Sequence, residues 1–343
     1  MEIPMRTAEL VGRDLLATQD WNRDELELAI DSAMRVKKLY KEGSLPELFK
    51  DKTMFMLFYN TSTRTRSSFE AAATILGGHS QFIDFASTRG SEGEAVKDVA
   101  RMYERLGHVL GIRVLEAAVD YLYGKGHQVI QEYADNCDIP TVSMADDMFH
   151  PTQAIADMMT IKEKMEKYEG KKYVISWAYT PHVRSWGSVQ DEALIATRFG
   201  MDVTMACPPG FELDPTIMKW AEDNAKANGR EFKVSHDFDR SLEGAHVVFP
   251  RSWASHECVT VGMNRFGKDK EASLHEKYRG WILDQKRLDS MDKKALVTHV
   301  LPVFRGQEAT DEVMDGPHSV ILDQAENLLY VRAALLALLT GTM

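Results

Sequence analysis

The sequence predicts an α/β protein of two doubly wound parallel-sheet domains, with a C-terminal helix that packs back on the N-terminal domain. Short, nearly continuous apolar runs alternate with segments of helical periodicity, which is the pattern of parallel strands buried on both faces. The 343 residues exceed one typical domain. A hydrophobic content of 44% with 27% charged residues is typical of a globular protein that folds unaided.

The chain is predicted to open with a helix from Asp24 to Lys41, where apolar residues recur at helical spacing, acidic residues come early and lysines late. Thr53 to Tyr59 predicts a buried strand, and Ser67 to Leu76 returns to helical periodicity. The segment between them is therefore a strand-to-helix junction. Further buried strands are predicted at Val109 to Val114, Thr141 to Met144, Tyr173 to Ala178, Val203 to Ala206, Val247 to Phe249 and Val297 to Leu301.

A domain boundary is predicted beside His150-Pro151, which precedes a long helical pattern from Ala154 to Glu169. We expect residues 1–150, together with the strongly apolar closing helix at 324–343, to form one domain and residues 151–323 to form the other. The stretch from Ser255 to Arg279 favours no particular structure.

Composition indicates which ligands and which cellular compartment suit this chain. The 41 basic and 52 acidic residues give a net charge of −11, which disfavours nucleic acid and requires a local basic pocket for any anionic substrate. Cys137, Cys207 and Cys258 form no Cys-x-x-Cys pair, which argues against a disulfide framework or structural zinc and favours the cytoplasm. The N-terminus has no apolar signal region and no run is long enough to cross a bilayer, so neither export nor membrane anchoring is expected.

The first motif with chemical meaning is Ser62-Thr63-Arg64-Thr65-Arg66, at the junction between the first strand and its helix. Helix N–H groups, hydroxyls and a guanidinium that converge on one point are what a phosphate requires. Taken alone, the same letters also suit a Ser/Thr helix cap followed by solvated arginines. This motif therefore predicts a phosphate site only in combination with the other motifs of the chain.

Two further motifs suit a carbamoyl group. In His150-Pro151-Thr152-Gln153 the imidazole can donate to a carbonyl oxygen, and the amide can pair with an amide. In His299-Val300-Leu301-Pro302 a proline at a strand end frees backbone carbonyls to hold an –NH₂. Each has a structural alternative, a capped turn and a strand-terminating proline respectively.

Together with Gly111-Ile112-Arg113-Val114, these motifs resemble the aspartate/ornithine carbamoyltransferase superfamily, in the same order and at comparable spacing. The resemblance extends over nearly the whole chain, from Gly12-Arg13-Asp14-Leu15-Leu16 to Asp323-Gln324-Ala325-Glu326-Asn327. It implies an enzyme that transfers a carbamoyl group from carbamoyl phosphate to an amine.

The resemblance also implies the residues that bind carbamoyl phosphate. Ser62, Thr63, Arg64, Thr65 and Arg113 would bind the phosphate, and His150, Gln153 and Leu301 the carbamoyl group. Arg113 and His150 would polarise the carbonyl as catalytic residues. We expect no nucleophilic side chain, no metal and no organic cofactor, because positioning and electrostatics suffice for this reaction.

The assembly implied by the resemblance is a homotrimer or a multiple of trimers, with sites shared between subunits. Residues 87–94 resemble the loop that a neighbouring subunit contributes, with Arg89 as its candidate site residue. The alternative for this segment is a mobile, solvated surface loop.

The acceptor is expected to be small and to carry a carboxylate, as ornithine or an N-acylornithine does. The chain is most similar to N-acylornithine carbamoyltransferases and related members of unassigned acceptor, yet departs from their pattern at Phe304, Glu308 and Leu328. Bidentate recognition by arginine would hold the carboxylate. The candidate acceptor residues are Arg251, Ser252, Trp253, Val300 and Arg305, with Arg184 as a further possibility and Glu308 paired either with an acceptor cation or with Arg305.

Three rival functions stay open at this point. The same residues would serve a catabolic enzyme that cleaves a ureido compound by phosphorolysis. A regulatory protein that only binds carbamoyl phosphate would keep the pocket without turnover, although such a protein commonly loses its charged site residues first. A dinucleotide-dependent oxidoreductase is disfavoured because no Gly-x-Gly-x-x-Gly follows the early strands.

Overall fold

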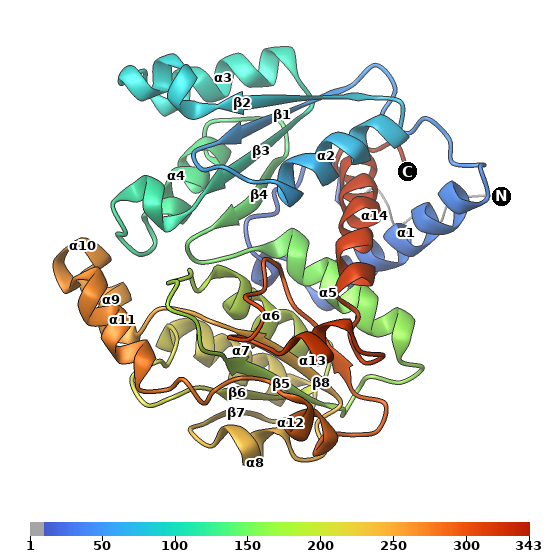
Figure 1. The fold of residues 1–343 in the computed structure, drawn as a ribbon. Helices are drawn as coiled ribbons and strands as arrows, with labels where there is room; N and C mark the ends of the chain where they lie inside the picture. Colours follow the sequence, from blue (N-terminus) through green and yellow to red (C-terminus); the bar gives the residue numbers. More distant parts are fainter. Residues whose placement is uncertain (1–9) are drawn as a thin grey trace. The chain divides into compact units, whose positions relative to one another are not determined.

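The computed structural model describes residues 10–343, which form two compact units (Figure 1). The described part of the first unit comprises residues 10–119, 124–159 and 325–343, and the second comprises residues 120–123 and 160–324. The first nine residues, for which the sequence predicts no targeting segment, lie outside the described residues.

The first unit is built on four parallel strands in the order β2-β1-β3-β4. The chain moves outward from β1 to the edge strand β2 and then crosses back to β3, so the strand order reverses between β1 and β3. In doubly wound sheets, ligands bind beyond the carboxyl ends of the strands at such a reversal. The strands are β1 (Thr53–Phe58), β2 (His79–Asp84), β3 (Val109–Val114) and β4 (Thr141–Asp146).

Helices flank this sheet, and the predicted return of the C-terminal helix is confirmed. The backbone N–H of Gly12 donates to the Leu339 carbonyl at 3.0 Å, and the Tyr40 and Tyr330 rings lie 6.0 Å apart. In Figure 1 α14 lies beside α2. The principal helices are α1 (Arg23–Lys41), α2 (Arg64–Ile75), α3 (Val96–Leu106), α4 (Lys125–Ala134), α5 (Pro151–Lys164) and α14 (Ile321–Leu339), with short 3-10 turns at η2 (Thr18–Asp20), η3 (Phe85–Ser87), η4 (Arg89–Glu92) and η5 (Glu116–Val119).

The second unit repeats the plan with five parallel strands in the order β7-β6-β5-β8-β9. Its order reverses between β5 and β8. The strands are β5 (Lys172–Trp177), β6 (Asp202–Ala206), β7 (Phe232–Ser235), β8 (Val247–Arg251) and β9 (Leu296–Val297). The helices are α6 (Gly187–Arg198), α7 (Pro215–Ala227), α8 (Phe238–Leu242), α9 (His256–Val261), α10 (Met263–Phe266), α11 (Lys268–Glu276), α12 (Gln285–Asp289) and α13 (Asp311–Asp315).

Each reversal point carries an arginine near the carboxyl end of the strand that follows the crossover. Arg113 on β3 is in register with Phe58 of β1, and Arg251 on β8 is in register with Trp177 of β5. The two sheets therefore place one guanidinium each at the position where a doubly wound sheet receives its ligand.

The structure corrects several boundaries. Helix α2 begins at Arg64, three residues before the predicted Ser67, and α5 ends at Lys164 rather than at Glu169. The predicted strand at 297–301 is a strand only at Leu296–Val297. Residues 255–279 contain three short helices, α9 to α11, separated at Gly262 and Gly267, whose φ angles of 89° and 98° favour glycine.

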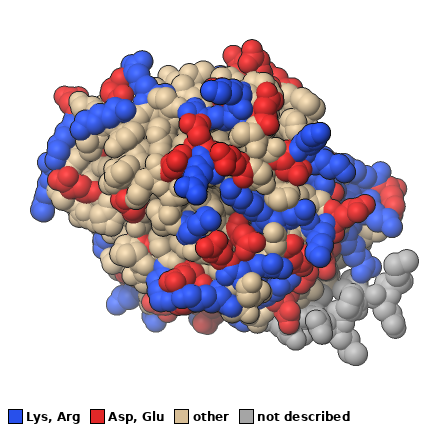
Figure 2. Space-filling view, turned by 90° about the horizontal axis from the view of Figure 1, so that it is seen from below, with Lys and Arg blue, Asp and Glu red and all other residues tan. Residues whose placement is uncertain are grey.

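The surface carries both signs of charge. On the face drawn in Figure 2, basic and acidic side chains are intermixed rather than gathered into one field. Within residues 10–343, no helix combines the length and the apolar character that a membrane span needs.

Candidate functional site

The motif at the start of α2 is placed at the reversal point of the first sheet. Strand β1 ends at Phe58, and α2 begins at Arg64 with Thr63 at its N-cap position. No side-chain cap hydrogen bond from Thr63 is found within the described chain, so the Ser/Thr-cap alternative does not describe this junction. Thr63 is exposed and Ser62 half-buried. Hydroxyls and first-turn N–H groups are therefore available together, as anion binding requires.

Arg113 faces this junction from β3. Its Nη1 donates to the Thr65 hydroxyl at 3.3 Å. Burial lowers the pKa of Arg113 to about 10, with Glu116 opposing the shift and the positive charge of Arg64 adding to it. Two guanidiniums close enough to disfavour each other's charge would be relieved by a bound anion.

Arg332 on α14 is a site residue that the sequence analysis missed. It is fully buried, its Nη1 donates to the Thr65 carbonyl at 3.3 Å and to the Ser68 hydroxyl, and its Nη2 donates to the Thr152 hydroxyl at 3.3 Å. Its guanidinium lies 4.4 Å from the centroid of the Phe69 ring. Burial, and then the charge of Arg113, lower its pKa to about 9. The available signal was a single charged residue within the apolar run 328–339.

The carbamoyl motif stands at the start of α5. His150 precedes the helix, and its carbonyl accepts from the Gln153 N–H at 3.1 Å. Gln153 is buried, and its Nε2 donates to Asp157 Oδ1 at 2.7 Å. Because the two polar atoms of an amide lie on opposite sides, this bond directs Oε1 away from Asp157 as an acceptor for an –NH₂ group. Arg332 thus connects the helix of the phosphate motif with that of the carbamoyl motif.

In the second unit, the carbonyl-rich turn after β9 contacts Arg251. Arg251 Nη1 donates to the Pro302 carbonyl at 3.1 Å, and Arg251 is only 8% exposed. The Leu301 N–H donates to His299 Nδ1 at 2.8 Å, which places the ring proton on Nε2 in the neutral imidazole. Leu301 is half-buried and has a φ of 53°, whereas Val300 is buried. The turn holds its backbone polar groups in a defined arrangement.

Glu308 connects the end of β8 with the turn that follows β9. It is fully buried and accepts from the N–H groups of Ser252 and Phe304, both at 2.9 Å. Its carboxylate oxygens lie 3.9 Å from Arg251 Nη1 and 3.5 Å from His299 Nε2. Burial alone would raise the pKa of Glu308, but His299, Arg251 and the Ser252 N–H outweigh it and lower the pKa to about 2.

This geometry corrects one expectation about Glu308 and Arg305. Glu308 pairs with Arg251 and His299 rather than with Arg305. The Arg305 guanidinium instead binds Asp311 at 2.8 Å and Asp315 at 2.7 Å on an exposed surface. Two carboxylates already neutralise Arg305, which leaves Arg251 the stronger candidate for an acceptor carboxylate.

The Glu308 contacts predict a pH-dependent part of the stability. The folded pKa of about 2 lies below the ordinary 4.5, so this contribution is complete above pH 4.5 and is lost as pH falls through 2. The difference corresponds to about 3 kcal/mol, to order of magnitude. In urea unfolding between pH 6 and pH 3, wild type should lose stability more steeply than Glu308→Gln, with exposed Glu312→Gln as control. Parallel curves for wild type and Glu308→Gln would contradict the assignment.

The candidate Arg184 lies in the loop after the carboxyl end of β5, together with His182, which the sequence analysis did not name. The His182 ring stacks on the Phe304 ring with centroids 4.5 Å apart, and the Arg184 guanidinium lies 4.9 Å from the same ring. Among the described residues, Arg184 Nε has no hydrogen-bond partner. The Thr180-Pro181 turn immediately after β5 was the available signal. This loop therefore brings a cation and an aromatic face to the reversal point of the second sheet.

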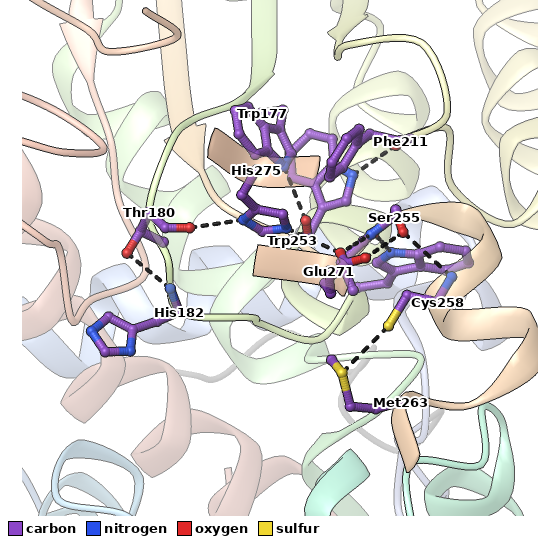
Figure 3. Close-up of polar contacts among 12 residues, drawn as sticks. Trp177, Thr180, His182, Phe211, Trp253, Ser255, Cys258, Met263, Glu271 and His275 are labelled. Atoms are coloured by element: carbon purple, nitrogen blue, oxygen red, sulfur yellow. Dashed lines mark hydrogen bonds and ion pairs between the residues drawn. The ribbon is translucent and has the colours of Figure 1, made fainter. Parts of the chain in front are cut away.

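Trp253 has a supporting position. It is fully buried, its Nε1 donates to the Phe211 carbonyl at 2.8 Å, and its own carbonyl accepts from Trp177 Nε1 at 2.9 Å (Figure 3). Ser252 is also fully buried. Both residues therefore hold the segment that carries Arg251, and their side chains have no exposed surface to offer a ligand.

A buried network fastens the segment that follows Trp253. Glu271 accepts from the N–H and the hydroxyl of Ser255, both at 2.6 Å, and lies 3.0 Å from His275 Nε2 (Figure 3). His275 Nδ1 lies 2.8 Å from the Thr180 carbonyl, which can only accept, so Nδ1 carries a proton. Burial alone would raise the pKa of Glu271, but the bonds to His275 and Ser255 outweigh it and lower the pKa. The network links the loop after β5 with the segment after β8.

Arg89 lies on the surface of the first unit. Its side chain is 77% exposed and its Nη1 forms an ion pair with Glu92 at 2.5 Å within η4. The single chain thus presents Arg89 to solvent.

Comparison with protein families assigns both halves of the chain. The family described as "Aspartate/ornithine carbamoyltransferase, carbamoyl-P binding domain" matches residues 13–163. The family described as "Aspartate/ornithine carbamoyltransferase, Asp/Orn binding domain" matches residues 184–339.

Full-length relatives agree with this match. An N-acetylornithine carbamoyltransferase of Xanthomonas campestris pv. campestris is 33% identical over 345 residues, covering 96% of this chain and 98% of the relative. An anabolic ornithine carbamoyltransferase of Pyrococcus furiosus is 34% identical over 334 residues, covering 97% of this chain and 98% of the relative.

Solved structures show the same fold. The Pyrococcus furiosus ornithine carbamoyltransferase superposes with a TM-score of 0.85 at 32% identity, covering 97% of this chain and 99% of that one. An acetylornithine transcarbamylase complexed with acetylcitrulline superposes with a TM-score of 0.85 at 31% identity, covering 95% and 99%. A variant N-acetyl-L-ornithine transcarbamylase complexed with carbamyl phosphate and N-succinyl-L-norvaline gives 0.86 at 31% identity, with the same coverage.

Proposed function

This chain belongs to the aspartate/ornithine carbamoyltransferase family, and we propose that it transfers the carbamoyl group of carbamoyl phosphate to the amine of a small carboxylate-bearing acceptor, ornithine-like or N-acylornithine-like, with release of phosphate. The observation that carries this proposal is the group of Arg64, Arg113 and Arg332 at the reversal point of the first sheet. Arg113 and Arg332 are deprived of water and each is disfavoured by a neighbouring positive charge. A phosphate dianion is the ligand that such a group accommodates best.

Different residues of the first unit would bind the phosphate and the carbamoyl group of the substrate. Ser62, Thr63, Thr65 and the first-turn N–H groups of α2 bind the phosphoryl oxygens together with Arg64 and Arg113. His150 donates to the carbamoyl oxygen, and Gln153 Oε1 accepts from the carbamoyl –NH₂. By the family resemblance, the Leu301 carbonyl is the proposed further acceptor for the carbamoyl –NH₂.

The reaction follows from this arrangement. The neutral amine of the acceptor attacks the carbamoyl carbon and a tetrahedral oxyanion forms, which Arg113 and His150 stabilise as the catalytic residues. The C–O bond to phosphate then breaks, and phosphate leaves with the bonding electron pair and accepts the proton from the attacking nitrogen. No residue needs to form a covalent intermediate, because the gain comes from positioning and preorganised charge.

The acceptor would be recognised by the second unit. Arg251 is the proposed carboxylate ligand, positioned by Glu308 and by Ser252 and Trp253, whose backbones continue from it. Arg184, with its guanidinium beside Phe304, is a second cation for the same role. Val300 is the proposed apolar neighbour of the acceptor. Arg305 contributes least, because Asp311 and Asp315 already hold it.

The function is tested by measuring phosphate release from carbamoyl phosphate with a panel of amines. Ornithine, N-acylornithines, aspartate and putrescine are supplied separately, and we expect release only with a carboxylate-bearing amine. Absence of release with every amine would overturn the proposal. A parallel reaction with ureido compounds and phosphate, followed by carbamoyl phosphate formation, distinguishes the catabolic direction.

We further propose a homotrimeric unit in the cytoplasm, with Arg89 contributed to the site of a neighbouring subunit. The resemblance of residues 87–94 to the shared loop of the family and the 77% exposure of the Arg89 side chain support this role. Cys137, Cys207 and Cys258 are free thiols, as is usual in the reducing cytoplasm. Sedimentation equilibrium of the purified protein tests the trimer, and a monomeric mass would contradict it.

Arg332 acts in this scheme as a positioning residue, and Arg332→Met tests that role. Its hydrogen-bond partners among the described residues are carbonyl and hydroxyl oxygens on α2 and α5. We expect the KM for carbamoyl phosphate to rise roughly 10- to 100-fold, since hydrogen bonds to charged groups are worth about 1.5–3 kcal/mol. The free energy of unfolding should fall little or even rise, because the buried charge has no carboxylate partner in the described chain.

The control for this variant is Arg332→Lys, which keeps the charge but loses the planar fork, and it should give an intermediate KM. Steady-state kinetics and urea unfolding are measured on the same preparations. Loss of stability with an unchanged KM for carbamoyl phosphate would reduce Arg332 to a structural residue.

A further inference from the structure

Three side chains that bind metals meet at the carboxyl ends of β6 and β7 in the second unit. Cys207 directly follows β6, His236 directly follows β7, and Glu212 lies in the loop after Cys207. The Cys207 sulfur, a ring nitrogen of His236 and a carboxylate oxygen of Glu212 all lie within 4.8 Å of one another. These strands lie on the opposite side of β5 from β8, so the group is separate from the reversal point that carries Arg251.

Backbone pairing and a turn bring Cys207, His236 and Glu212 together. Ala206 is in register with Ser235, and the Cys207 N–H continues the ladder by donating to the Ser235 carbonyl at 3.0 Å. Cys207 and His236 therefore follow each other across the strand ends. The loop then turns back at Gly210, whose φ of 88° favours glycine, and this turn returns Glu212 to the strand ends.

Two of the three side chains are already oriented as metal ligands usually are. His236 Nδ1 lies 2.8 Å from the Cys207 carbonyl, which can only accept, so in the neutral ring the lone pair is on Nε2. Nε2 is 3.4 Å from Glu212 Oε1, while Glu212 Oε2 accepts from the Gly210 N–H at 2.9 Å. Backbone bonds of this kind fix the tautomer and direction of ligating side chains.

The geometry points to a site for one thiophilic divalent cation, Zn²⁺ foremost, with Cys207 Sγ, His236 Nε2 and a Glu212 carboxylate oxygen as ligands. Bonds of about 2.0–2.3 Å in a tetrahedral site separate ligands by roughly 3.3–3.8 Å. The 3.4 Å between His236 and Glu212 matches this spacing, and the remaining separations within 4.8 Å require a small closure. Three protein ligands leave a fourth position for water or an exogenous ligand.

The charges of the three ligands and their exposure to solvent suit a bound cation. A Zn²⁺ ion would balance one thiolate and one carboxylate, and the thiol proton would pass to the buffer. Exposure is graded across the ligands, from buried Cys207 to half-buried Glu212 and exposed His236. Because His236 is exposed, a cation can reach the group from solvent.

The loop that carries two of these ligands also supports the aromatic core of the second unit. Phe211, which precedes Glu212, accepts from Trp253 Nε1 at 2.8 Å and packs on Trp177 with ring centroids 5.0 Å apart (Figure 3). A metal that fixes both ends of the 207–212 loop would therefore stabilise this core. We expect thermal unfolding of the full chain to shift upward when Zn²⁺ is added.

The test uses Co²⁺ and Zn²⁺ on the full-length protein after treatment with a chelator. Co²⁺ should give a thiolate-to-metal charge-transfer band with a stoichiometry of one per chain, and Zn²⁺ should displace it. Cys207→Ser should abolish the band. His236→Gln and Glu212→Gln, at less buried positions, should each weaken Zn²⁺ binding by about 100-fold, at the upper end of losses seen for supporting residues of metal sites.

The matched control is Cys258→Ser, a buried thiol outside the group, which should bind both metals as wild type does. Circular dichroism and thermal melts verify that each variant is folded. Absence of the band in wild type would overturn the site, as would unchanged Zn²⁺ affinity in folded His236→Gln and Glu212→Gln. None of these readouts requires carbamoyl transfer, so they are independent of the proposed activity.

Discussion

Arg64→Ala is expected to lower kcat/KM for carbamoyl phosphate by about 10²–10³-fold, the usual effect of removing one preorganised donor at a developing charge. Arg64 opens α2 and is close enough to Arg113 to lower the pKa of that buried guanidinium. Its removal would leave the phosphate with one fewer positive charge at the helix start. The fold should persist, because Arg64 is half-buried at a helix end rather than in the core.

Arg66→Ala is the matched control for this experiment. Arg66 belongs to the same motif and helix, but its Nε forms an ion pair with Glu70 at 2.9 Å and its guanidinium lies 3.9 Å from the centroid of the Phe82 ring. We expect activity near that of wild type. Both variants are compared by initial rates and by thermal melts, and a folded Arg64→Ala enzyme of near-normal activity would refute the phosphate assignment.

Arg251→Ala is expected to raise the KM of the acceptor by about 100-fold while changing that of carbamoyl phosphate little. A bidentate arginine–carboxylate contact in a sheltered place is worth about 1.5–3 kcal/mol, and only the acceptor would lose it. Arg251 is 8% exposed and lies in register with Trp177 at the reversal point of the second sheet. The measurement is the pair of KM values, obtained by varying each substrate at saturating levels of the other.

Arg251 also faces Glu308 and the Pro302 carbonyl, so stability has to be followed alongside kinetics. Arg251→Lys keeps a positive charge near Glu308 and should restore stability better than it restores acceptor affinity, because lysine lacks the planar fork. Arg305→Ala is the matched control at an arginine held by Asp311 and Asp315, and its acceptor KM should stay close to wild type. Equal rises in both KM values would remove Arg251 from acceptor binding.

Buried strands could be predicted from the sequence, and strands exposed to solvent could not. Strands β1, β3 and β5 are continuous apolar runs, because helices cover both of their faces. Strands β2 and β7 have no buried residues and gave no apolar run to detect, whereas the edge strand β4 is buried throughout and was predicted. Their absence from the prediction hid the reversal of strand order that locates each ligand position.

The candidate phosphate site could be predicted from the sequence, because its first residues are contiguous. Residues 62–66 lie on one strand-to-helix junction, so the hydroxyls, N–H groups and guanidinium proposed to bind phosphate are neighbours in the sequence itself. The arginines of the acceptor side were harder to rank. Arg251 and Arg305 cannot be distinguished by sequence alone. In the structure, Arg251 lies beside buried Glu308, whereas Arg305 is held by two exposed aspartates.

By itself, the sequence determined the alternation of strands and helices, the junction proposed to bind phosphate, and the family to which the chain belongs. Only the tertiary structure decided which distant side chains share a site. Arg332 meets Thr65 across 267 positions of the chain, and Cys207, Glu212 and His236 meet without any regular spacing. The physical reason is that hydrophobic periodicity reports burial along one element, whereas the partner of a buried charge is set by packing between elements.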